Sequence, residues 1–186
     1  NDRWIKNPLK FQKKTFHKLI EKAKKTTFGI DHGFENIKTY EDWKKNVPIR
    51  DYEGLREYVD LVVDGKKDVL WPGKPQYFCK TSGTTSGTKY IPLTKEALPF
   101  HIKAARDAIL SFIYETKKTA VVNGKMIFLQ GSPELENING VLTGRLSGIT
   151  AHHVPKYLQK NRLPSLTTNC IENWEDKVDA IVDETI

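Results

Sequence analysis

Hydroxyl and glycine side chains are concentrated in one short stretch, residues 80–92, which reads KTSGTTSGTKYIP. Glycines let backbone N–H groups approach an anion closely, hydroxyls add hydrogen-bond donors, and lysines add positive charge. This combination is typical of a loop that wraps a phosphate group. The candidates for contacting the phosphates are Ser82, Gly83, Thr84, Thr85, Ser86, Gly87, Thr88 and Lys89.

A flexible linker could have a similar composition. The flanking segments argue against a linker, because residues 77–79 read as the end of a buried strand and residues 93–96 as the entry to a long helix. A loop between a strand and a helix is a common place for phosphate binding. Lys80 lies on the strand side, and the sequence leaves open whether it contacts phosphate or is structural.

The spacing of the loop excludes two common nucleotide-binding motifs. A Walker A loop has four residues between its glycines and ends in Lys-Ser or Lys-Thr. Here three residues separate Gly83 from Gly87, and Thr88-Lys89 reverses the final order. The G-x-G-x-x-G pattern of dinucleotide-binding folds is not matched either.

The surrounding pattern predicts an α/β fold with helices packed on a β-sheet. Apolar spacing and capping residues predict helices over residues 8–25, 39–47, 52–63, 94–115 and 173–186, and strands over residues 77–80, 125–130 and 141–142. We therefore divide the chain into a helical segment, residues 1–75, and an α/β segment that carries the loop, residues 76–186. Two helices have apolar stripes that we expect to face a core: Phe11, Thr15, Phe16, Leu19, Ile20 and Ala23 in the first, and Leu98, Ile102, Ala105, Ile109, Phe112 and Ile113 in the long one.

The chain has 186 residues, of which 38% are hydrophobic and 28% charged, as in a globular protein. Its net charge of +7 arises within residues 1–50, and the basic face of helix 8–25 accounts for most of it. This face could bind a polyanion or an anionic membrane. We favour a solvated helix surface, and we expect neither nucleic acid nor membrane as a partner. The oligomeric state is left open.

The cysteines and histidines do not predict a metal site. Cys79 and Cys170 are far apart and match no metal-binding spacing. Cys79 is expected to be a small buried apolar residue, and a reducing cytoplasm fits this cysteine usage. The adjacent His152 and His153 would point to opposite sides of an extended backbone, so we expect hydrogen-bonded surface residues there.

The first half of the loop, Thr81-Ser82-Gly83-Thr84-Thr85, resembles the signature of adenylate-forming enzymes, the superfamily of acyl-CoA synthetases and luciferases. The second half, residues 86–92, departs from the CoA-ligase form. It is similar to the loop of the auxin-responsive acyl-acid amido synthetases of plants and their bacterial relatives. The first helix, the segment Pro48-Ile49-Arg50-Asp51-Tyr52-Glu53 and the Trp71-Pro72-Gly73 turn also resemble that family.

The resemblance implies the N-terminal portion of a large adenylate-forming domain, whose enzymes use ATP and Mg²⁺ to join a carboxylic acid to an amino acid. The acid is first adenylated with release of pyrophosphate, and the amine then displaces AMP. The family's Tyr-x-x-Ser-Glu segment, its nucleotide-binding aspartate and its C-terminal domain are not found in these residues. We therefore expect the magnesium ligand to lie elsewhere, and residues 1–186 alone to be inactive and to bind ATP poorly. No catalytic residue is assigned.

The resemblance also suggests where the acid binds. In related plant enzymes an arginine on the helix after the loop lies in the acyl pocket, and Arg106 occupies that helix here. Arg145 is a second candidate, and Leu142, Thr143 and Leu146 are pocket candidates by analogy. An ordinary surface arginine at position 106 is the alternative.

Four functions remain open, of which the amido synthetase is favoured. The others are an acyl- or aryl-CoA ligase, a non-enzymatic anion-binding module that uses helix 8–25, and a structural α/β domain in which the loop only turns a corner.

Overall fold

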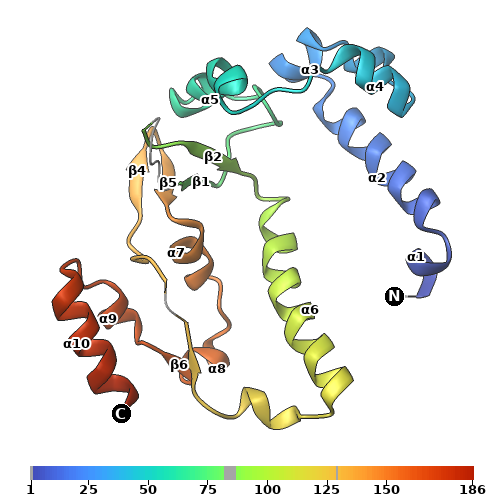
Figure 1. The fold of residues 1–186 in the computed structure, drawn as a ribbon. Helices are drawn as coiled ribbons and strands as arrows, with labels where there is room; N and C mark the ends of the chain where they lie inside the picture. Colours follow the sequence, from blue (N-terminus) through green and yellow to red (C-terminus); the bar gives the residue numbers. More distant parts are fainter. Residues whose placement is uncertain (1, 82–86, 129) are drawn as a thin grey trace. The chain divides into compact units, whose positions relative to one another are not determined.

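The structure, a computed structural model, describes residues 2–81, 87–128 and 130–186. The chain divides into two compact units, one ending at Pro75 and one running from Gln76 to Ile186 (Figure 1). No helix in the described part of the chain is both long and apolar enough to cross a membrane.

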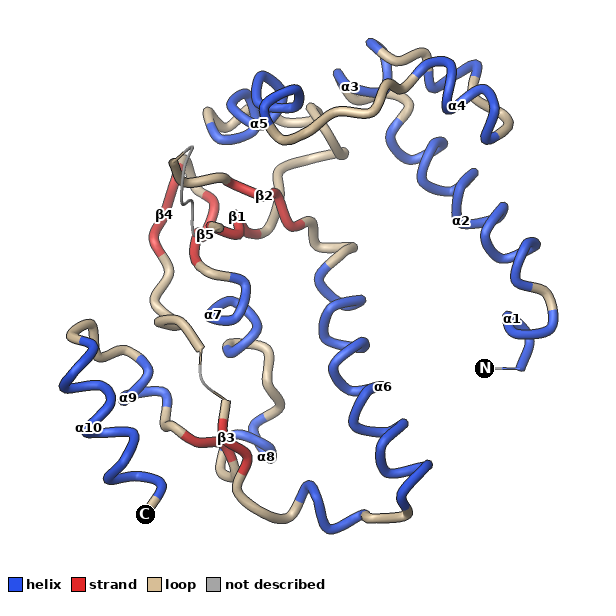
Figure 2. The backbone as a smooth tube through the Cα atoms, viewed as in Figure 1, coloured by secondary structure: helices blue, strands red, loops and turns tan. Residues whose placement is uncertain are grey.

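The described elements of the first unit are helical (Figure 2). They are α1 (Asp2–Lys6), α2 (Pro8–Ala23), α3 (Thr27–Asp31), η1 (Phe34–Asn36), α4 (Tyr40–Asn46), η2 (Glu53–Leu55) and α5 (Arg56–Val63). One apolar cluster joins α2 to η1 and consists of buried Ile20, Ala23, Phe34 and Ile37. Phe16, Phe28, Trp43, Val47 and Trp71 pack around this cluster.

The predicted core face of α2 is buried only towards its C-terminal end. Ile20 and Ala23 are buried, whereas Phe11 and Leu19 on the predicted stripe are exposed. The expectation that the whole stripe faces a core is therefore wrong for this unit. The physical reason is that the η1 residues meet only the last turns of the helix.

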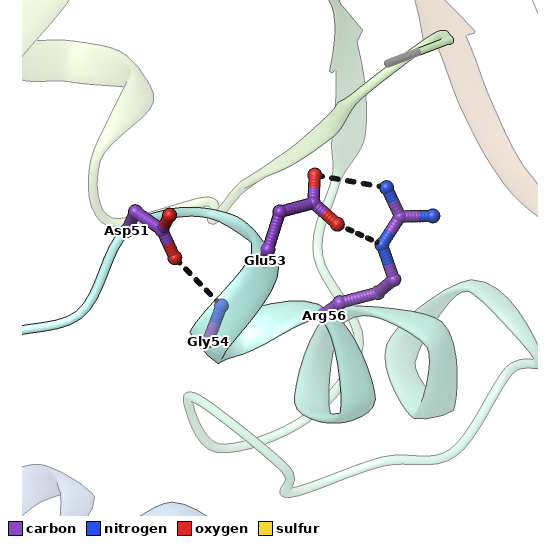
Figure 3. A network of polar contacts seen from close by, with 4 residues as sticks. All are labelled: Asp51, Glu53, Gly54 and Arg56. Carbon is purple, nitrogen blue, oxygen red and sulfur yellow. Dashed lines mark hydrogen bonds and ion pairs between the residues drawn. The ribbon is translucent and has the colours of Figure 1, made fainter.

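Local side-chain contacts define the helix starts that the sequence predicted. At α4, Thr39 and Asp42 form a reciprocal capping box, in which each side chain accepts from the other's backbone N–H. Before η2, the Asp51 carboxylate accepts from the Gly54 N–H at 2.8 Å, and Glu53 pairs with Arg56 one turn later (Figure 3). The chain after α5 returns to α3, where Thr27 and Phe28 N–H groups donate to the carbonyls of residues 68 and 69.

The segment after α4 is joined to α3 by a histidine. The buried His32 places Nδ1 2.8 Å from the Phe28 carbonyl and Nε2 2.7 Å from the Arg50 guanidinium. A carbonyl only accepts, so Nδ1 carries the proton and Nε2 accepts from Arg50. The His32 ring also stacks on Phe28, with centroids 4.0 Å apart.

The second unit contains a four-stranded sheet with strand order β2-β1-β5-β4 (Figure 1). The strands are β1 (Tyr77–Lys80), β2 (Tyr90–Leu93), β4 (Glu136–Ile138) and β5 (Val141–Gly144). β1 pairs with β2 and β5 pairs with β4 in antiparallel fashion, while β1 and β5 run parallel. A separate pair consists of β3 (Met126–Ile127) and β6 (Arg162–Leu163).

Strand β2 differs from the sequence prediction. We expected the loop to lead directly into a helix, but residues 90–93 form an edge strand antiparallel to β1, and α6 (Leu98–Thr116) follows. Pro92 lacks an N–H donor, and an edge strand is the place in a sheet where proline is tolerated. The predicted helix start at Thr94 therefore lies four residues before the observed start at Leu98. Thr94 instead accepts a hydrogen bond from the Ala97 N–H in the turn before α6.

Strand alternation gives the sheet two distinct faces. Tyr77, Cys79 and Leu93 lie on one face and form a core with Leu98 of α6 and Ile149 of α7 (Leu146–Ala151). Cys79 is buried as predicted, and burial raises the pKa of its thiol. The register places Phe78, Lys80, Thr143 and Glu136 on the opposite face.

Two predictions of burial in this unit are wrong. Along α6 only Leu98 is buried, and the predicted stripe residues Ala105 and Phe112 are exposed. Of the predicted buried strand over residues 125–130, the described residues form only β3, and position 129 lies outside them. Ile127 in β3 and Phe128 after it are 59% and 47% exposed. The half-exposed Phe128 ring is partly covered by the Arg162 guanidinium of β6, 5.8 Å from its centroid.

The remaining described helices of the second unit are three short ones and one longer one. η3 (Thr119–Val122), α8 (Lys156–Gln159) and α9 (Leu166–Asn169) are short, and α10 (Trp174–Thr185) confirms the predicted final helix. Asn173 caps α10 by accepting from the N–H groups of Glu175 and Asp176. α10 is joined to α9 by Lys177, whose Nζ donates to the Asn169 carbonyl at 2.6 Å.

Candidate functional site

The hydroxyl- and glycine-rich loop connects the two strands of a β-hairpin. The backbone N–H of Thr81 donates to the carbonyl of Lys89 at 3.1 Å, directly beyond the last pair of the ladder, Lys80 with Tyr90. This bond brings the two ends of the loop together at the end of β1. Five predicted phosphate contacts, Ser82, Gly83, Thr84, Thr85 and Ser86, lie outside the described residues.

The described part of the loop offers backbone and hydroxyl donors. Gly87 has φ of +80°, a left-handed conformation that glycine adopts without strain, and a Cβ added there would meet no atom within 4 Å. Thr88 is exposed and Lys89 is half-buried. An open left-handed glycine, a hydroxyl and an ammonium group are a donor set that fits a phosphate anion.

Among the described residues, no helix N-terminus is part of this arrangement. The sequence reading placed a helix directly after the loop, which would add the positive end of the helix dipole to the phosphate site. Because β2 intervenes, α6 begins at Leu98, on the far side of the strand from the loop. In the described part of the chain, an anion at the hairpin loop would therefore contact backbone and side-chain donors and not the start of α6.

Lys80 has a partner that the sequence did not indicate. Its Nζ donates to Oε2 of Glu136 at 2.6 Å, and the two side chains are 25% and 67% exposed. Glu136 belongs to β4, two strands away from β1 in the sheet. Because 56 residues separate the pair along the chain, no local pattern could have predicted the contact.

The acyl-site candidate Arg106 is exposed on α6. Its guanidinium pairs with the carboxylate of the neighbouring Asp107, with Nη2 2.7 Å from Oδ1. An exposed pair between adjacent residues constrains the arginine little.

Leu142 and Thr143 point to opposite faces of the sheet, because they are successive residues of β5. Thr143 is 1% exposed, and its hydroxyl donates to the Val141 carbonyl at 3.2 Å. Leu142 is 41% exposed. In this arrangement the two side chains cannot line one face together.

Arg145 follows β5 and is the N-cap residue of α7. It is exposed, and its side chain runs against Gly131: a Cβ at position 131 would lie 2.6 Å from the Arg145 Cδ. Leu146, the first residue of α7, is also exposed. Arg145 thus follows the end of β5 and Leu142 lies within that strand, whereas the side-chain hydrogen bonds of Arg106 are made within its own helix.

The two adjacent histidines form separate hydrogen bonds, as the sequence predicted. His153 Nε2 lies 3.1 Å from the Tyr77 hydroxyl, and His152 Nε2 lies 2.7 Å from the Pro133 carbonyl. Over residues 2–81, 87–128 and 130–186, no group of three or more His, Cys, Asp or Glu side chains is placed to hold a metal ion.

The arrangement of helices packed on a small sheet is similar to that in solved acyl acid amido synthetases. The structure matches the N-terminal portion of two GH3.15 acyl acid amido synthetase structures, with TM-scores of 0.67 and 0.70 over 88% and 92% of this chain. Their sequence identities are 22% and 18%, and the match covers 29% of each solved chain. The first of them was solved in complex with 2,4-DB.

Residues 2–173 match the GH3 family N-terminal domain, so the chain belongs to the GH3 family. It is 25% identical over 142 residues to the jasmonoyl–L-amino acid synthetase JAR6 of Nicotiana attenuata, covering 75% of this chain and 24% of the relative. It is 31% identical over 104 residues to the indole-3-acetic acid-amido synthetase GH3.15 of Arabidopsis thaliana, covering 47% and 18%. The chain thus spans about a quarter or less of the length of these curated relatives.

Proposed function

We propose that the protein carrying this chain uses ATP to adenylate a carboxylic acid and then transfers the acyl group to an amino acid, forming an amide. The observation that carries this proposal is membership of the GH3 family over residues 2–173, combined with the hairpin loop at the end of β1. The relatives named as jasmonoyl- and indole-acetic acid-amido synthetases support the reaction class. The cytoplasm is the proposed location.

The hairpin loop would bind the phosphates of ATP as a substrate. Breaking the bond between the α- and β-phosphates transfers negative charge to the departing pyrophosphate, which donors aimed at those oxygens stabilise. Backbone N–H groups near Gly87, the Thr88 hydroxyl and the Lys89 ammonium fit this role. The hydroxyls of residues 82–86 are proposed as further donors. Mg²⁺ would offset phosphate charge, with ligands drawn from outside the described residues.

The acid enters as a carboxylate, and Arg106 is proposed to attract it. Leu142, Thr143 and Arg145 remain proposed pocket residues, and Leu142 and Arg145 are the more accessible of these three. Neither the acid nor the amino acid is assigned.

A screen of pyrophosphate release tests the proposal. The full-length protein is incubated with ATP, Mg²⁺ and single carboxylic acids, with and without a mixture of amino acids. Acid-dependent pyrophosphate release that rises on adding amino acids is expected. No release with any acid of a broad aliphatic and aryl panel would contradict the proposal.

A further inference from the structure

The ion pair between Lys80 and Glu136 lies on one face of the sheet, beside the loop. Phe78 pairs with Thr143, and Thr143 pairs with Glu136, so Phe78, Thr143 and Glu136 share a face. Lys80 lies two residues beyond Phe78 on the same strand and therefore shares this face too. Its ammonium reaches over β5 to Glu136 at 2.6 Å.

The position of Lys80 connects this pair to the loop. Lys80 is the last residue of β1, and the next residue, Thr81, makes the backbone bond that closes the loop against Lys89. An ammonium group has three N–H donors, and Glu136 takes one of them. A positive charge at the base of a phosphate-binding loop would ordinarily contribute to anion binding.

The two partners differ in exposure, and this difference makes an exchange favourable. Glu136 is 67% exposed, so its carboxylate can return to water at little cost, whereas Lys80 is only 25% exposed. A triphosphate carries more negative charge than one carboxylate and offers several acceptor oxygens. It can therefore replace the carboxylate as the partner of the ammonium group.

We propose that Lys80 is a further phosphate ligand and that Glu136 occupies its ammonium group while no nucleotide is bound. ATP must then displace the carboxylate, so Glu136 acts through Lys80 as a competing anion. This inference rests on the proposed function, because it takes the hairpin loop as the place where the phosphates bind. The alternative is an ion pair that only stabilises the sheet by holding β1 and β4 in register. Removing such a pair would not change the affinity for ATP.

Equilibrium binding of ATP to the full-length protein, measured by calorimetry without any acid, separates these roles. Lys80→Met should weaken ATP binding about tenfold, since one charge-assisted hydrogen bond to phosphate is lost. Glu136→Gln should tighten it by about threefold, because the competing charge is removed. The double variant should bind like Lys80→Met alone, because Glu136 acts only through the lysine.

The exposed pair between Lys44 and Glu41 in α4 supplies matched controls. Lys44→Met and Glu41→Gln remove the same charges and should leave the affinity for ATP unchanged. Equal affinities of wild type and Glu136→Gln, or weaker binding by both single variants, would overturn the inference. Tighter binding by Glu136→Gln that persists in the Lys80→Met background would also overturn it.

Pyrophosphate release by the same proteins keeps the two proposals apart. If the binding pattern is as expected but no acid supports pyrophosphate release, the proposed function fails and the phosphate role of Lys80 stands. If acids are adenylated but neither substitution changes the affinity for ATP, the inference about Lys80 and Glu136 fails and the proposed function stands.

Discussion

The backbone N–H of Thr81 donates to the carbonyl of Lys89 at 3.1 Å. This hydrogen bond joins the two ends of the candidate phosphate-binding loop, which connects the strands of a β-hairpin. The loop is therefore held at both ends by the pairing of β1 with β2. This arrangement differs from a strand–loop–helix motif, in which a helix dipole assists anion binding. Donors of the loop, together with the proposed contributions of Lys80 and Mg²⁺, would supply the stabilisation instead.

Gly87 tests whether the loop backbone contributes to ATP use. Gly87→Ala should cost about 1 kcal/mol of stability, because alanine is strained at a positive φ while the surrounding space is open. It should also lower kcat/KM for ATP about tenfold, because the strain turns nearby N–H groups away from the phosphates. Denaturant unfolding and steady-state kinetics of the full-length protein measure the two effects.

Gly73 provides the control, since it has φ of +79° and equally open surroundings in the turn before β1. Gly73→Ala should show a similar loss of stability and unchanged kinetics. Equal kinetic effects at positions 73 and 87 would mean that general destabilisation, and not the loop, determines the activity.

Arg106 tests the proposed recognition of the carboxylate. Arg106→Met should raise KM for the acid at least tenfold and leave KM for ATP unchanged, because only the acid loses an opposite charge. Arg56, which forms an exposed pair with Glu53 in the first unit (Figure 3), is the matched control. If Arg56→Met and Arg106→Met behave alike, Arg106 is an ordinary surface arginine.

Leu142 and Thr143 test which face of β5 meets the acid. Leu142→Ala should change KM for the acid with little loss of stability, because the side chain is accessible. Thr143→Val should change KM for the acid less than Leu142→Ala does, because Thr143 is buried, and it should cost about 1 kcal/mol, because it removes the hydrogen bond to Val141. The reverse pattern in a kinetic and unfolding comparison would place the acid on the Thr143 face.

Glu184 gives the fold of α9 and α10 a dependence on pH. Hydrogen bonds from Ser165 and then from Thr168 lower the pKa of the Glu184 carboxyl. Because the folded-state pKa lies below the unfolded value, this stabilisation is present above the ordinary glutamate pKa of about 4.3 and is lost as the pH falls through the folded value. Between about pH 5 and about pH 3, the free energy of unfolding of Glu184→Gln should therefore fall less than that of the wild type.

Urea unfolding at several pH values measures this difference. Glu175→Gln, which removes an exposed carboxylate from the same helix, is the control and should follow the wild type. Parallel pH profiles for Glu184→Gln and wild type would contradict the assignment.

The sequence predicted those features that local interactions determine. The capped helix that starts after Thr39, the buried strand before the loop and the final helix all follow from neighbouring residues. It also predicted the family, because the loop carries a specific run of residues.

Features that depend on distant partners could not be predicted in the same way. Apolar periodicity identified α6 as a helix, but burial of Ala105 and Phe112 depends on what covers them, and no other described element does. The strand β2 was missed because Pro92 is compatible with pairing only at a sheet edge, which the sequence does not reveal. Glu136 could be linked to Lys80 only once the order of β1, β5 and β4 was known.

The most direct test of the proposed amide-forming reaction is the fate of the activated acid. Full-length protein is supplied with ATP, Mg²⁺ and an acid that supports pyrophosphate release, and then with either coenzyme A or a mixture of amino acids. We predict that the amino acids accelerate AMP release and that mass spectrometry detects the acyl–amino acid amide. Acceleration by coenzyme A with formation of a thioester, and no amide product, would contradict the account.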